Sequence, residues 1–161
     1  MRRVLSLAGA AALALLVGSA SAEAQTMRFT ALLSGANEVP GIASGSGGTA
    51  TVTLNTATRA VTYKVDVYNM PSGTTQAHFH VGGPGVAGPV VVNFVVQPNI
   101  SNDFSISGTA TSADLVPRQA QGIGSWDDFI EALVLGQVYA NVHSTVNPGG
   151  EIRGQVLPVP E

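Results

Sequence analysis

The chain has 161 residues, a net charge of −3 and only 11% charged residues, and it contains no cysteine. The missing cysteine excludes disulfide bonds and lipid attachment through a thiol. No basic run follows the first few residues, so nothing supports a nucleic-acid partner or a polybasic membrane contact. Side-chain packing and backbone pairing must therefore stabilise the fold, and a bound metal is an optional further contribution.

The first residues are typical of a secretory signal peptide. Two arginines precede an apolar run at 4–17, and small residues follow that run, which is the order of regions in such peptides. Cleavage after Ala22 or after Ala24 fits the pattern. The run is shorter than the roughly 20 residues that a spanning helix needs. We expect a cleaved peptide at 1–24 and one domain at 25–161, periplasmic or secreted and without a membrane anchor; an uncleaved N-terminal anchor is the alternative.

Apolar and polar residues alternate through most of the remaining chain. The clearest case is the segment 60–68, where Val61, Tyr63 and Val65 face one way and the residues between them face the other. A period of two indicates half-buried strands. The apolar run at 89–96 is continuous, as expected of a central strand. The predicted strands are 27–33, 49–55, 60–68, 77–81, 89–96, 103–112, 137–143 and 150–156.

One segment, at about 126–135, has the spacing of a helix instead. Its apolar residues recur at helical intervals, and Ser125 with Asp128 three residues later resembles a capping box. Gly136 is expected to end this helix. The predicted fold is therefore all-β: an antiparallel, immunoglobulin-like β-sandwich or a barrel of about eight strands, with one short helical insertion.

The strand alternation also places the three histidines of the chain. His78 and His80 flank Phe79, which we expect in the core, so both imidazoles point to the opposite face. Val142 is a core residue by the same pattern, which turns His143 away from the core. All three histidines thus lie on non-core faces. A shared site requires the strand at 77–81 to lie beside the strand at 137–143.

The last two strands are expected to pair as a hairpin. With Asn147 near the middle of the turn, His143 lies opposite Glu151 and Asn141 lies opposite Arg153. A slip by one residue would expose the core residues of the last strand, so the pattern favours this register. It makes Glu151 a neighbour of His143, and Asn141 and Arg153 neighbours of the same site.

A His-x-His pair with a third, distant histidine is typical of zinc and copper sites, because imidazole suits both ions. We predict a copper or zinc ion on His78, His80 and His143. Glu151 is either the fourth ligand or a second-shell group that orients His143. The alternative is that the histidines are surface imidazoles, hydrogen-bonded to Thr and Asn neighbours.

Three motifs resemble the CHRD domain, a family named after the protein chordin: "SGANEVP", "AHFHVGGPGVAGPVVV" and "NVHSTVNPGGEIRGQ". The resemblance runs from about Phe29 to Val156. Ser144 stands where the family commonly has threonine, and Phe79 where it commonly has isoleucine. The resemblance implies a secreted all-β domain, and it places the two histidine motifs among the family's signatures. In animals the module occurs in a protein that binds growth factors.

A weaker resemblance, to copper–zinc superoxide dismutase, covers only "AHFHVGGPGVAG", without that family's cysteine pair or bridging histidines. We therefore expect an exported CHRD-type binding domain, non-enzymatic, with copper or zinc on three histidines. The alternatives are a mononuclear copper redox enzyme and a structural or protein-interaction module without metal. We interpret Asn37 and Glu38 as a turn, with a ligand-contributing loop as the alternative.

Overall fold

The computed structural model describes residues 25–160, and they form one strongly curved antiparallel sheet. The strands follow the order β5-β4-β7-β8-β1-β2-β3-β6, and β9 pairs with β1 outside this path. They are β1 (Thr26–Ser34), β2 (Gly47–Asn55), β3 (Val61–Met70), β4 (Thr74–Val81), β5 (Val90–Asn93), β6 (Asn102–Ala110), β7 (Val138–Ser144), β8 (Ile152–Gln155) and β9 (Leu157–Pro158). The signal-peptide prediction at 1–24 lies outside the described residues.

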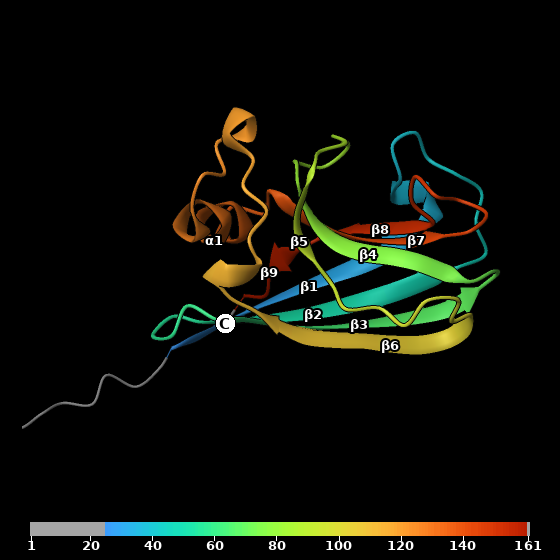
Figure 1. The fold of residues 1–161 in the computed structure, drawn as a ribbon, viewed down its shortest axis with the longest axis horizontal. Coiled ribbons are helices and arrows are strands. Elements are labelled where there is room, and N and C mark those ends of the chain that lie inside the picture. The colour runs from blue at the N-terminus through green and yellow to red at the C-terminus, as the bar shows by residue number, and fades with distance from the viewer. Residues whose placement is uncertain (1–24, 161) are drawn as a thin grey trace, which may run out of the picture.

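The sheet curls so that β4, β7 and β8 lie above β1, β2, β3 and β6, as Figure 1 shows. This confirms the predicted all-β antiparallel fold. Because the strands form one continuous path rather than two separate sheets, the fold is closest to the barrel alternative. Within residues 25–160, no helix is long and apolar enough to span a bilayer.

Aromatic side chains from both layers of the sheet meet in the core. Phe79 of β4 has no exposed surface, and its ring centroid lies 5.7 Å from that of Tyr63 on β3 and 4.6 Å from that of Phe94. Contacts between rings at these distances stabilise a core beyond the burial of their area. The predicted role of Phe79 as the core residue between two histidines is confirmed.

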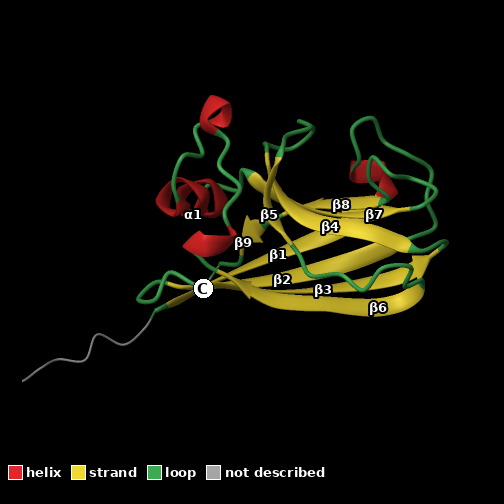
Figure 2. Ribbon diagram, in the orientation of Figure 1, coloured by secondary structure: helices red, strands yellow, loops and turns green. Residues whose placement is uncertain are grey.

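The predicted helix is α1 (Trp126–Val134), which lies at one end of the barrel. Its capping box is present: the Ser125 Oγ accepts from the Asp128 N–H at 3.2 Å, and the Asp128 carboxylate accepts from the Ser125 N–H at 2.7 Å. Phe129 and Leu133 are fully buried on its inner face. Three 3-10 turns accompany it in the described chain: η1 (Gly35–Asn37), η2 (Ser112–Asp114) and η3 (Gln119–Gln121). Figure 2 shows η1 with the loops at the end opposite α1.

The prediction of a central strand at 89–96 is wrong. Only Val90–Asn93 is a strand, and β5 lies at an edge of the sheet. Val91 and Val92 are nevertheless fully buried, because the segment after η2 covers this edge: Val92 bridges Leu115, and the Val116 N–H donates to the Val91 carbonyl at 2.8 Å. A continuous apolar run therefore indicates that both faces of a strand are buried. An edge strand that another segment covers meets this condition as well as a central strand does.

Candidate metal centre

The three histidines come together on the outer face of two paired strands. β4 pairs with β7 so that His78 lies opposite Asn141 and Gln76 lies opposite His143. The ring centroids are 5.4 Å apart for His78 and His80, 5.0 Å for His78 and His143, and 6.0 Å for His80 and His143. One ligand nitrogen from each lies within 4.8 Å of the other two. The strand adjacency that a shared site requires is therefore present.

Although the histidines point away from the core, they are not on the protein surface. His78 is 5% exposed, and His80 and His143 are each 8% exposed. Two loops cover them, since His80 contacts Gly88 in the loop after β4 and His143 contacts Pro148 in the turn after β7. The interpretation as surface imidazoles is therefore wrong. β7 is accordingly buried along both of its faces.

Hydrogen bonds to backbone carbonyls determine where the protons of two imidazoles lie. The Nδ1 atom of His80 is 2.9 Å from the Gly88 oxygen, and the Nδ1 atom of His143 is 2.9 Å from the Pro148 oxygen. A carbonyl only accepts, so each Nδ1 must donate, and each Nε2 carries a lone pair. The Nε2 atom of His80 is buried without any hydrogen-bond partner. The Nε2 atom of His143 lies 3.2 Å from Nδ1 of His78.

The residues present fit a metal ion. Histidines that bind metal ordinarily donate their other ring N–H to a carbonyl or a carboxylate, as His80 and His143 do. In a tetrahedral site with bonds of 2.0–2.1 Å, ligand nitrogens lie about 3.3 Å apart, close to the 3.2 Å between His78 and His143. The unpartnered nitrogen of His80 is a buried polar atom that an ion would satisfy.

Burial keeps all three imidazoles neutral, which is the form that binds metal. Desolvation, with a contribution from the neighbouring His143 and His80, lowers the pKa of His78 to about 4. Desolvation also lowers the pKa of His80 to about 4, against the opposing hydrogen bond to Gly88. The pKa of His143 is lowered for the same reason. Near neutral pH the lone pairs are therefore available without loss of a proton from a cationic ring.

These shifts predict that acid destabilises the metal-free protein. Between pH 6.5 and pH 4 the unfolded chain protonates His78 and His80 while the native state does not, so stability falls as the pH falls. The raised pKa of Glu38, about 7, acts in the opposite direction and offsets one histidine. Between pH 6 and pH 5 the net slope is about 1 kcal/mol per pH unit; between pH 7 and pH 6 it is smaller, because Glu38 titrates there and the histidines of the unfolded chain are only partly protonated. Urea unfolding with a chelator at pH 7, 6 and 5 measures it, and a flat profile would contradict the burial of the imidazoles.

Glu151, the predicted fourth ligand or second-shell group, is engaged elsewhere. The predicted hairpin register is confirmed, because Asn141 pairs with Arg153 and Val142 with Ile152. The Glu151 carboxylate, however, accepts hydrogen bonds from Ser44, from Ser144 at 2.7 Å and from Asn147 at 2.7 Å. Burial by itself would raise the pKa of this carboxyl, but the hydrogen bonds outweigh it and lower the pKa. Glu151 is not among the clustered ligand groups; it ties the loop after β1 to the turn after β7.

A different carboxylate, that of Glu38, lies beside the site. Its Oε2 accepts from the Asn141 amide at 3.4 Å, and its Oε1 is buried without a partner. Desolvation raises the pKa of Glu38 to about 7, against the opposing charge of Arg153 and the hydrogen bond from Asn141. Gly150 makes room for this carboxylate, because a Cβ at that position would lie 2.6 Å from both oxygens. The 3-10 turn η1 agrees with the turn interpretation at 35–37, but that interpretation missed the inward reach of Glu38.

Asn141 and Arg153, the predicted neighbours, do lie beside the histidines. Asn141 is the cross-strand neighbour of His78, and Arg153 is the cross-strand neighbour of Asn141. The Arg153 guanidinium lies 3.4 Å from the centroid of the Tyr139 ring, which in turn stacks on His80 with centroids 4.8 Å apart. An ordered polar layer therefore extends across β4, β7 and β8.

The glycine-rich loop after β4 holds His80 in place. The Gly88 carbonyl accepts from both His80 and the Tyr139 hydroxyl, the latter at 3.0 Å. No side chain fits at position 88, because a Cβ there would lie 1.6 Å from the Val81 carbonyl oxygen. The close approach of these two backbone segments explains why this position must be glycine.

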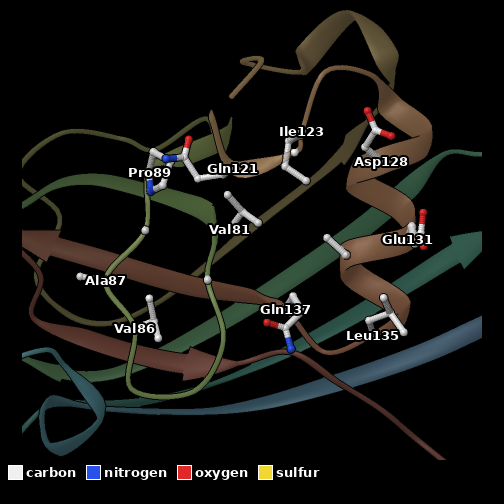
Figure 3. A pocket seen from close by; sticks show the side chains of 14 residues that line it. Val81, Val86, Ala87, Pro89, Gln121, Ile123, Asp128, Glu131, Leu135 and Gln137 are labelled. Carbon is white, nitrogen blue, oxygen red and sulfur yellow. The ribbon is translucent and has the colours of Figure 1, made fainter. Parts of the chain in front are cut away.

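A cavity of about 560 Å³ lies on the other side of this loop, between it and α1. Figure 3 shows Val81, Val86 and Leu135 around it, with Asp128 and Glu131 on the helix. The Asp128 carboxylate is already used by the capping box. None of the three histidines lines this cavity, so it is separate from the histidine cluster.

The fold and the site define an antiparallel β-domain whose outer face carries a buried cluster of three histidines. The family model for the CHRD domain matches residues 29–156, and the chain belongs to this family. The resemblance expected from the sequence motifs is therefore confirmed over nearly the same span. No curated protein and no solved structure gave a significant match.

Proposed function

We propose that this chain is an exported, non-enzymatic CHRD-type binding domain that holds one copper or zinc ion on His78, His80 and His143. The buried Nε2 of His80, which has no hydrogen-bond partner, carries this proposal, because an unsatisfied buried lone pair costs about 1–3 kcal/mol. A metal bond removes that cost. The family membership and the composition of residues 1–24 support export.

The residues of the chain have separate roles in this proposal. The three imidazoles supply neutral nitrogen ligands, and the ion, when bound, supplies cross-linking between β4 and β7. The Gly88 and Pro148 carbonyls hold two of the rings in the tautomer that leaves Nε2 free. His78 donates from Nδ1 to His143 in the absence of metal, so binding requires only that this proton move to its Nε2.

Metal analysis of the protein, purified without a histidine tag, tests the proposal. We expect about one copper or zinc ion per chain in the wild type and a near-complete loss in His78→Ala/His80→Ala. Gln76→Ala is the matched control, because Gln76 lies on the same strand, is exposed and pairs opposite His143. Metal content near zero in the wild type after exposure to both ions would overturn the site. Superoxide turnover that rises with copper loading would overturn the non-enzymatic assignment.

A further inference from the structure

The side chain of Arg153 is a buried cation without an ion pair. Arg153 is 3% exposed, and its Nη2 donates to the Gly83 carbonyl at 3.2 Å. Within residues 25–160 the ion pairs join Arg59 to Asp127 and Lys64 to Asp66, so neither includes Arg153. A buried charge is costly unless a counter-charge or a full set of hydrogen bonds compensates it. Among the described residues, the Tyr139 ring and the Gly83 carbonyl contact the guanidinium, but no carboxylate pairs with it.

The nearest acidic group does not replace the missing counter-ion. Burial raises the pKa of Glu38 to about 7, so its carboxyl is only partly ionised near neutral pH. It makes no ion pair with Arg153. Its Oε1 and the Asn141 Oδ1 are both buried without partners. A protonated carboxyl is a hydrogen-bond donor, so the protonated fraction of Glu38, about half near pH 7, presents a donor next to the guanidinium.

Arg153 and Glu38 line the same cleft. This cleft has a volume of about 300 Å³, and Asn37, Gly85 and Gln155 also line it. Its volume lies at the lower end of the range for small-molecule sites, so a small ligand fits. The other face of the guanidinium rests on Tyr139, which stacks on His80. A ligand at Arg153 would therefore lie one ring away from the histidine cluster.

We propose that this cleft binds a small planar oxyanion, of the size of bicarbonate or a simple carboxylate, through the Arg153 guanidinium with Glu38 as a second donor. The guanidinium presents paired N–H groups that match two oxygens of such an anion. The anion supplies the missing counter-charge. This site does not require a metal ion, so it can be tested whether or not the histidines bind one.

The experiment measures the thermal stability of the chelator-treated full chain against increasing sodium bicarbonate, sodium acetate or sodium chloride at constant ionic strength. We expect a saturable rise in Tm with at least one oxyanion and none with chloride. Arg153→Gln is expected to weaken the oxyanion affinity by about tenfold or more. Arg118→Gln, which also removes a guanidinium that donates to a backbone carbonyl, is the matched control and should bind as the wild type does.

A second variant keeps the test decisive if Arg153→Gln does not fold. Glu38→Gln fixes a neutral donor beside Arg153, so it should bind the oxyanion at least as tightly as the wild type at pH 8. An equal response to chloride and to both oxyanions would overturn the proposal, as would wild-type affinity in a folded Arg153→Gln. Adding zinc to the same protein and repeating the oxyanion titration separates the two sites. If the protein binds no zinc but still binds the oxyanion, only the metal centre is rejected.

Discussion

Replacing Phe79 with alanine is expected to lower the free energy of unfolding by about 3–5 kcal/mol, the usual cost of truncating a buried phenylalanine. The ring has no exposed surface and packs against side chains from β3, from α1 and from the segment after β5. These neighbours belong to different parts of the fold, so they cannot all move into the cavity that the missing ring leaves. We therefore expect a loss in the upper part of that range.

The same substitution should also weaken metal binding, because Phe79 fixes the strand between His78 and His80. Urea unfolding of the chelator-treated protein measures the stability, and a zinc titration of the folded variant measures the affinity. Tyr68→Ala removes an aromatic ring that is 45% exposed, and it should change stability by less than about 1 kcal/mol. A similar loss in both variants would show that Phe79 is not the anchor of this strand.

Replacing Glu151 with alanine should lower the unfolding free energy by about 2–4 kcal/mol, because hydrogen bonds to a buried charge contribute more than neutral ones. Ser44, Ser144 and Asn147 would lose their common acceptor. These residues join the loop that carries Glu38 to the turn that carries Pro148, the partner of His143. We therefore also expect a looser histidine cluster and a lower metal affinity.

Three variants separate these effects of Glu151. Glu131→Ala removes an exposed carboxylate from α1 and should leave both stability and metal affinity unchanged. Glu151→Gln keeps the size of the side chain, but its amide NH₂ group faces the donors of Ser44, Ser144 and Asn147. Its free energy of unfolding should therefore be close to that of Glu151→Ala. If Glu151→Ala lost stability but retained full metal affinity in the folded state, Glu151 would be structural only.

Much of the site could be predicted from the strand pattern. Alternation alone gives the face of His78, His80 and His143, because a side chain on a strand can point to only two sides. The hairpin register followed from the need to bury Ile152, and the structure has that register. The helix at 126–135 could be predicted from its spacing and its cap, both of which are local.

The burial of the histidines could not be predicted in this way. The loop after β4 and the turn after β7 cover them, and contacts such as the Tyr139–Gly88 and Ser44–Glu151 hydrogen bonds, between residues far apart in the chain, determine where these segments lie. Glu151 shows the limit of a register argument: the register predicts it opposite His143, but it precedes β8 and its carboxylate accepts from Ser144. The only sequence feature that pointed to Glu38 was that it is an acidic residue in a chain with few charges. Its hydrogen bond with Asn141 depends on the position of η1, which the sequence pattern did not give.

The alternation on β4 also separates the packing of the core from the composition of the histidine cluster, although one strand carries both. Phe79 and its core neighbours determine stability from one side of the strand, while His78 and His80 interact only with loops and rings on the other side. The ligand set can therefore be altered one residue at a time without repacking the apolar core. For protein engineering, β4 is therefore a strand on which either histidine of the proposed site can be replaced by another metal-binding side chain while the apolar core is kept.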